Sequence, residues 1–166
     1  MKNTNLSIRA SLSLAFLFLF SSLAVNQAWA AACSASISPY AISCDATGVT
    51  WSTGALTINT GVTVSNEFTV SNTSSTFVNN GSLITNNGLD GLHVGGVTTV
   101  TNNGIISGSF AGIQGSATNF VNNGTVSGGY AFLNNGPISS FVNNSSISGS
   151  VVGIYNTNTI IIPKFT

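Results

Sequence analysis

Charged side chains are scarce in this sequence of 166 residues: Lys and Arg together number 3, Asp and Glu together number 3, and there is 1 His. Two of the three basic residues stand near the N-terminus, and the rest of the chain holds only Lys164. The three carboxylates all lie further along the chain: Asp45, Glu67 and Asp90. A surface with so few cations has little means of neutralising phosphates, so nucleic acid and anionic lipid headgroups are poor partners.

The same scarcity argues against an enzyme. The one suggestive pair, Asp90 and His93, stands in the glycine-rich stretch LDGLHVGG without the G-x-S-x-G elbow of a hydrolase, and we interpret it as a solvated loop pair. A secreted glycan-active enzyme would need a cluster of carboxylates or basic residues that these few charges do not build. We therefore predict no catalytic residue, no cofactor and no metal site, since one His and two Cys do not complete one.

Long apolar runs are also missing. The longest, residues 12–25, falls short of the roughly 20 residues that a membrane helix needs, and it follows two basic residues. Ala28 and Ala30 then place small residues where a signal peptidase inspects the chain. We predict a helical signal peptide over residues 1–30, cleaved after Ala30, and a mature chain without a transmembrane segment. Export would bring it to the periplasm, the cell surface or the medium, and an uncleaved anchor is the alternative.

Cysteine occurs only twice, at Cys33 and Cys44, just after the predicted cleavage site. Exported proteins fold under oxidising conditions, so a disulfide is expected. Closing this short loop would contribute roughly 3 kcal/mol by restricting the unfolded chain. The alternative is lipidation of Cys33: small residues precede it, but the usual large aliphatic residue three positions before it is missing.

What the sequence does contain is a repeat marked by Asn and Gly, with a spacing of about twenty residues. FVNNG stands at 77–81 and 120–124, VTNNG at 100–104, FVNNS at 141–145, and a degenerate copy, TINTG, at 57–61. The first asparagines of these copies are Asn59, Asn79, Asn102, Asn122 and Asn143. The one longer step follows Asn79, where TNNGLDGLHVGG reads as an outward loop.

Aliphatic residues recur at two further places in each unit. One place is two residues after the glycine position and is occupied by Leu83, Ile106, Val126 and Ile147. The other lies further on and is occupied by Leu92, Ile113, Leu133 and Ile154. No amphipathic stretch of helix length is present, which disfavours leucine-rich repeats, and three short strands with three corners use about this many residues. Asn-Gly pairs are expected to supply the positive backbone dihedrals of sharp corners.

These features predict an all-β protein: a right-handed parallel β-helix, or solenoid, of about five coils stacked about 4.8 Å apart. The asparagines are expected to form amide ladders between coils, and Phe77, Phe120 and Phe141 are expected to pack in the core rather than to serve as a carbohydrate platform. The predicted organisation is a signal peptide at 1–30, an N-terminal cap at 31–54 and truncated repeats at 55–166. Ile160 begins what reads as a further coil.

A signal peptide followed by units such as VTNNGIISGSFAGIQ and SSISGSVVGIYNTNT resembles the passenger domains of Gram-negative autotransporters, the type V secretion system. The resemblance covers about residues 55–166, and similar repeats occur in two-partner secreted adhesins and other secreted solenoids. It implies a β-helical passenger at the cell surface that is an adhesin, an aggregation factor or the carrier of an inserted enzyme. The sequence departs from the family because its residues leave no room for a translocator barrel in the outer membrane.

Two functions of different classes follow. The first is a non-enzymatic, surface-exposed or secreted passenger segment that adheres to a host or bacterial surface ligand, or to another copy of itself. The second is an incomplete or remnant autotransporter segment without independent activity, and a secreted glycan-active enzyme ranks third. The reading frame beyond Thr166 would separate the first two.

Overall fold

The computed structural model describes residues 31–34, 43–47, 49–52, 54–71 and 76–158, which belong to one compact unit. The predicted signal peptide, its cleavage after Ala30 and the coil-like segment at Ile160 lie outside these residues. In the described ranges, no helix is long and apolar enough to cross a membrane.

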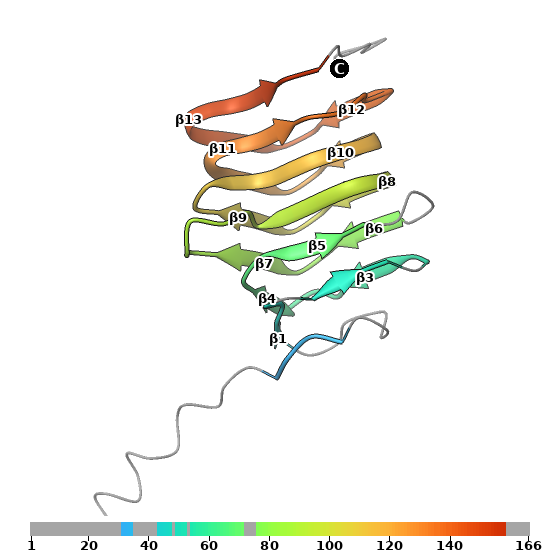
Figure 1. Cartoon of the computed structure of the whole chain (residues 1–166), viewed down its shortest axis with the longest axis vertical. Helices are drawn as coiled ribbons and strands as arrows, with labels where there is room; N and C mark the ends of the chain where they lie inside the picture. The colour runs from blue at the N-terminus through green and yellow to red at the C-terminus, as the bar shows by residue number, and fades with distance from the viewer. Residues whose placement is uncertain (1–30, 35–42, 48, 53, 72–75, 159–166) are drawn as a thin grey trace, which may run out of the picture. The chain divides into compact units, whose positions relative to one another are not determined.

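The described residues form a parallel β-solenoid whose strands stack on three faces (Figure 1). Face A consists of β1 (Cys44–Asp45), β4 (Thr63–Ser65), β7 (Ser82–Thr85), β9 (Ile105–Gly108) and the first parts of β11 (Thr125–Asn134) and β13 (Ser146–Asn156). Face B consists of β2 (Thr50–Trp51), β5 (Phe68–Val70), the first parts of β8 (Leu92–Asn102) and β10 (Ala111–Asn122), and the later parts of β11 and β13. Face C consists of β3 (Leu56–Ile58), β6 (Thr76–Asn79), the later parts of β8 and β10, and β12 (Ser140–Asn143).

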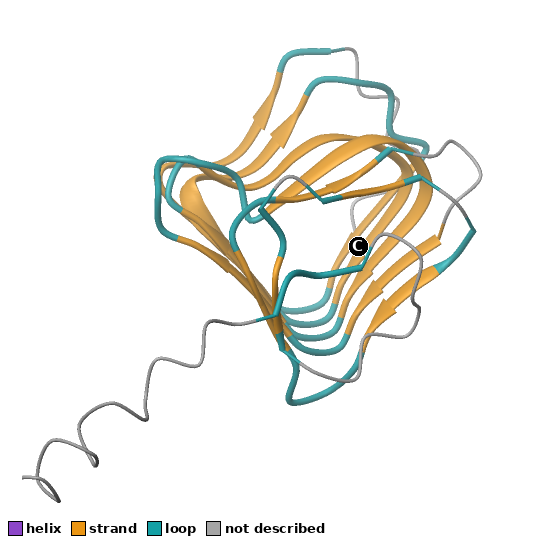
Figure 2. Ribbon diagram, turned by 60° about the horizontal axis from the view of Figure 1, so that its bottom comes forward, coloured by secondary structure: helices purple, strands orange, loops and turns teal. Residues whose placement is uncertain are grey.

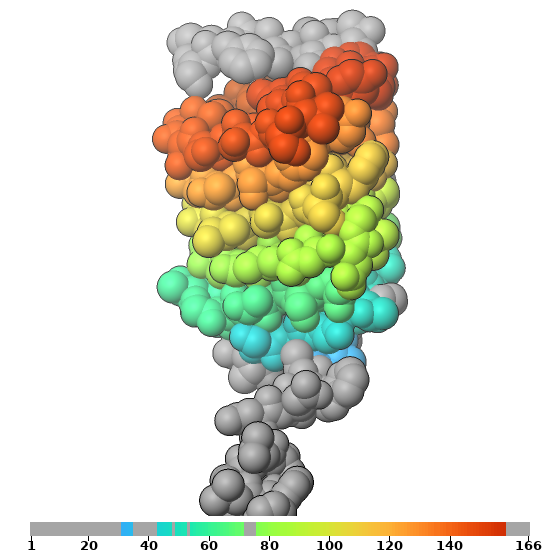
Figure 3. Space-filling view, turned by 90° about the vertical axis from the view of Figure 1, so that its left-hand side faces the viewer, coloured from blue at the N-terminus to red at the C-terminus, as the bar shows by residue number. Residues whose placement is uncertain are grey.

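Successive coils therefore lie directly over one another. Figure 2, which looks more nearly along the axis, shows the strands of neighbouring coils superimposed and the loops gathered at the corners. Figure 3 shows the same coils from the side as successive layers of colour. The predicted all-β solenoid with about five coils is confirmed.

Each face contributes a long inward row of apolar side chains, in register from coil to coil, and face B adds a shorter one of Trp51, Val70 and Val94. The row on face A is Val64, Leu83, Ile106, Val126 and Ile147. The row on face B is Phe68, Leu92, Ile113, Phe132 and Ile154. The row on face C is Leu56, Phe77, Val100, Phe120 and Phe141, so the repeated phenylalanines are core residues, at most 3% exposed. Identical strand direction and like-on-like stacking bury a continuous core that no single coil could form.

The register on face B differs from the expected one in the fourth unit. Phe132, rather than Leu133, lies opposite Ile113, and Phe132 is 2% exposed whereas Leu133 is half-buried and points outward. The larger apolar side chain fills the interior, where its ring centroid lies 4.7 Å from that of Phe120.

Register also separates Asn59 from the other repeat asparagines. Ile58, rather than Asn59, lies opposite Asn79, because buried Leu56 and Ile58 fix the alternation of the strand. Asn59 falls in the following turn, which is longer here than in later coils and contains Gly61 at a φ of 80°. The motif match at TINTG is therefore one residue out of alignment.

The stack begins earlier than residue 55. Within the segment assigned to a cap, β1 pairs with β4 and β2 pairs with β5, and Trp51 is 4% exposed opposite Val70. The additional residues after Asn79 lie at the corner before β8 and at Gly96, whose φ is 83°, beside a bulge in the pairing of β8 with β10.

Gly88, in a further NNG sequence, and Gly61 have the expected positive φ, at 77° and 80°, but Gly81, Gly104 and Gly124 of the repeat motifs do not and serve a different purpose. A Cβ placed on Gly104 would lie 1.9 Å from the carbonyl oxygen of Gly81, and one on Gly124 would lie 2.0 Å from that of Gly104. Glycine is needed at these corners because the preceding corner lies too close for a side chain, whereas the last copy carries Ser145 at the equivalent position.

Two ladders of amide hydrogen bonds run through these corners in opposite directions. The inner ladder is formed by Asn79, Asn102, Asn122 and Asn143, and each Nδ2 donates to the Oδ1 of the next asparagine at 2.8 Å. The outer ladder is formed by Asn80, Asn103, Asn123 and Asn144, and its Nδ2 groups donate back toward the N-terminus at 2.7–2.8 Å. Sequence reasoning predicted the first and missed the second.

The inner ladder also makes hydrogen bonds to buried backbone groups at the corners. Asn102 Nδ2 donates to the carbonyl of Thr125 in the next coil at 3.1 Å, and Asn102 Oδ1 accepts from the Gly104 N–H at 3.3 Å. Asn102 is fully buried, so water does not reach this site. Without the amide, these two backbone groups would be buried with no hydrogen bond from a side chain.

We predict that Asn102→Asp lowers the free energy of unfolding by about 3 kcal/mol or more at neutral pH, because it removes two donors and buries a carboxylate. Asn103→Asp, the same change in the exposed outer ladder, should cost less than about 1 kcal/mol. Chemical denaturation followed by circular dichroism measures both. Equal losses for the two variants would contradict the assigned role of the inner ladder.

Candidate functional site

The charged side chains of the described residues collect at the corner between faces A and B. Asp45 ends β1, Glu67 precedes β5, and Asp90 precedes β8, with His93 at the start of face B. Among the described residues there is no Lys or Arg, so none of them offsets the negative charge of this acidic corner.

Asp90 is a buried carboxylate, only 3% exposed, so the interpretation of Asp90 and His93 as a solvated pair was wrong for the aspartate. Its Oδ2 lies 3.5 Å from Nδ1 of the half-exposed His93. Gln114, with its amide nitrogen turned toward the carboxylate, donates to both oxygens, at 3.3 Å from Oδ1. The hydrogen bond to Asp90 raises the pKa of His93, as do the negative charges of Asp90 and Glu67, and partial burial opposes the shift.

His93 belongs to a row of outward side chains on face B, one from each coil. This outer row is Thr50, Thr69, His93, Gln114, Leu133 and Tyr155. Its character changes along the axis, from hydroxyl through imidazole and amide to apolar. In-register stacking thus presents a graded surface without any insertion into the solenoid.

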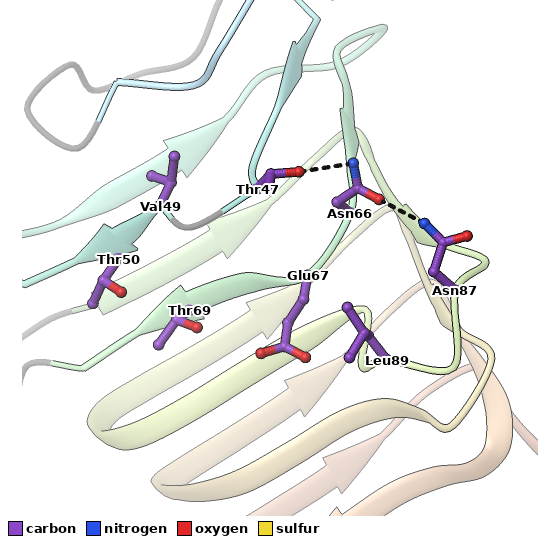
Figure 4. Close-up of a pocket in the computed structure, with 8 residues that line it drawn as sticks. All are labelled: Thr47, Val49, Thr50, Asn66, Glu67, Thr69, Asn87 and Leu89. Atoms are coloured by element: carbon purple, nitrogen blue, oxygen red, sulfur yellow. Dashed lines mark hydrogen bonds between the residues drawn. The ribbon is translucent and has the colours of Figure 1, made fainter.

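Beside the polar half of this row lies an open hollow of about 330 Å³ (Figure 4). Three threonines, two asparagines, one glutamate and two aliphatic residues line it. Figure 4 shows the Glu67 side chain between Thr69 and Leu89, with Asn66 and Asn87 along one side. Glu67 supplies the carboxylate of this lining, and its Oε2 accepts the backbone N–H of Asp90 at 3.4 Å.

The asparagine wall of the hollow is held by hydrogen bonds across coils. Asn66, at a φ of 66°, donates from Nδ2 to Asp45 Oδ1 at 2.9 Å and to Thr47 Oγ1 at 3.1 Å. Asn87 Nδ2 donates to Asn66 Oδ1 at 3.4 Å. Hydrogen bonds from the Thr47 side chain, then from Asn66 and from the Thr47 backbone, lower the pKa of Asp45. The wall is therefore fixed before any ligand arrives.

An exposed apolar strip continues from the hollow toward the C-terminal coils. It consists of Leu89, Phe110, Tyr130 and Tyr155, and Leu89, Phe110 and Tyr155 are each 44–46% exposed. The Phe110 and Tyr130 ring centroids are 5.6 Å apart, as are those of Tyr130 and Tyr155. Sequence reasoning missed this strip because it followed the buried phenylalanines. The available signal was a large apolar or aromatic residue two or three positions before the inward residue of face B in three successive units.

A disulfide joins Cys33 and Cys44, with their Cα atoms 4.9 Å apart and both side chains buried. This is the predicted pairing, and the bond occupies the sulfur that lipidation of Cys33 would require. In the part of the chain that the structure describes, no group of three His, Cys, Asp or Glu side chains is placed to hold a metal ion.

The chain matches no protein-family model, no curated protein and no solved structure in three separate comparisons.

We predict that the His93 imidazole titrates above its ordinary pKa and returns toward that value in Asp90→Asn, because the hydrogen bond and the negative charge are lost together. A raised folded-state pKa stabilises the protein below the unfolded-state pKa, and this contribution disappears as the pH rises through the folded-state pKa. The wild type should therefore exceed His93→Gln in stability by more at pH 5 than at pH 8. NMR titration of the imidazole and denaturation at the two pH values measure these effects. An unchanged midpoint in Asp90→Asn would contradict the assignment.

Proposed function

We propose that this chain is a non-enzymatic β-solenoid segment of an exported protein, and that face B with its adjoining corner adheres to ligands at a cell surface. The main support is the juxtaposition of the polar hollow and the apolar strip along one edge of the scaffold. Contiguous exposed apolar side chains rimmed by polar groups are typical of interaction sites. Elsewhere among the described residues, the exposed large apolar side chains are Ile105, Val151 and Ile154.

The repeat composition favours an autotransporter-like passenger. A passenger must remain folded outside the cell, and the amide ladders between coils favour that stability. Within this proposal the Asp90–His93 pair helps to hold the polar half of the binding face. Self-association of two copies through the apolar strip is the second way in which the same surface would act in adhesion.

The test compares two exposed apolar positions with equal exposure on different faces. Phe110 and Ile105 are each 44% exposed, but Phe110 lies in the apolar strip and Ile105 lies on face A. The full chain is produced with its own N-terminal segment in a Gram-negative host, recovered from the exported fractions and coated on beads. Adherence of the beads to the producing bacteria and to cultured epithelial cells is then counted.

We expect the wild type and Ile105→Ser to adhere equally and Phe110→Ser to adhere several-fold less, because loss of the Phe110 ring removes apolar area from the strip. Sedimentation shows whether the loss accompanies weaker self-association. Retention of the chain in the cytoplasm, or adherence unaffected by Phe110→Ser, would overturn the proposal.

A further inference from the structure

The hollow beside Glu67 is built for hydrogen bonding rather than for burial of a large apolar ligand. The hydroxyl groups of Thr50 and Thr69 can donate and accept, and the Glu67 carboxylate accepts at each oxygen. The Thr47 hydroxyl already donates to Asp45 and accepts from Asn66. Its volume, about 330 Å³, is near the lower end of the range for small-molecule sites. A ligand that fits must therefore be small in cross-section and rich in hydrogen-bonding groups.

Charge narrows the ligand class. The acidic corner places Asp45, Glu67 and Asp90 in successive coils, and no Lys or Arg occurs among the residues that the structure describes. Phosphate, sulfate or uronate groups would be repelled there. A carboxylate beside neutral hydroxyls instead favours sugar hydroxyl groups, to which it makes charge-assisted hydrogen bonds.

The apolar part of the lining also fits a sugar. Leu89, 46% exposed, and half-buried Val49 offer small aliphatic surfaces suited to the C–H face of a pyranose ring. The asparagine wall is already fixed by Asn66 and Asn87, so binding would not have to order it.

The register of the solenoid extends this site along the axis. Beyond Thr69, the next two coils present His93 and Gln114 at the same position of face B. Coils repeat about every 4.8 Å, a spacing comparable to one sugar unit of an extended chain. A linear glycan lying along face B would thus meet one polar side chain per sugar.

Resting on the proposed function, we infer that the hollow and the polar half of the outer row form a binding site for a neutral, linear glycan. Glu67 accepts hydrogen bonds from its hydroxyl groups, Thr69 both donates and accepts, and Leu89 contacts a ring face. The glycan is the ligand through which the segment adheres.

The inference is tested with the exported full chain and a panel of oligosaccharides. The panel contains neutral oligomers of glucose, mannose and N-acetylglucosamine, an oligomer of uronic acid and a lysine-rich peptide. Glu67→Gln removes the charge at constant shape, and Thr69→Val removes the hydroxyl while keeping a β-branched residue in the strand. Thr101→Val, a half-buried outward threonine on face C between Val78 and Val121, is the matched control.

Titration calorimetry should show binding of at least one neutral oligomer, weakened about ten-fold by Glu67→Gln and by Thr69→Val and unchanged by Thr101→Val. Denaturation curves establish that the variants remain folded. Binding of only the uronate oligomer or the peptide, or neutral-glycan binding that neither hollow variant weakens, would overturn the inference. Adherence that depends on Phe110 without any glycan binding would refute this site and leave the proposed function standing.

Discussion

The structure depends on the need to satisfy buried amides between coils. Asn102 is enclosed on all sides, and its amide nitrogen donates to Asn122 and Thr125 in the coil that follows, as well as to the Gly104 carbonyl in its own turn. A coil by itself would leave such groups without partners at a cost comparable to several ordinary hydrogen bonds. Parallel stacking in register satisfies all of them at once and brings the apolar rows of the three faces into contact. The outer ladder, whose hydrogen bonds run in the opposite direction, adds a second set of bonds at the same corners.

The same register builds the candidate site. Because each strand repeats the one beneath it, a single outward position becomes a row of side chains on face B, and each corner between faces A and B stacks on the previous one. The three carboxylates, which are far apart in the sequence, reach one corner in this way. Asp90 is buried there behind His93 and Gln114, while Glu67 remains beside the hollow. The site therefore needs no departure from the solenoid.

Sequence reasoning reached the fold because the NNG motif recurs at a nearly constant spacing, and the disulfide because export and two cysteines leave few alternatives. It misaligned Asn59 and Leu133, since a motif match cannot detect a longer turn or a neighbouring larger side chain that takes the interior position. It assigned the Asn-Gly glycines to positive φ, which holds for Gly88, whereas Gly81, Gly104 and Gly124 are required by the close approach of successive corners. The hollow and the apolar strip were not predicted, because they arise from residues on three or more coils whose sequence neighbours differ.

The most direct test of the account is NMR observation of the side-chain amide of Asn102. If the coils stack as described, its protons exchange slowly with solvent and show nuclear Overhauser effects to the backbone of Thr125 in the next coil, 23 residues away. Rapid exchange with no contact to Thr125 would contradict the inner ladder and, with it, the in-register stack.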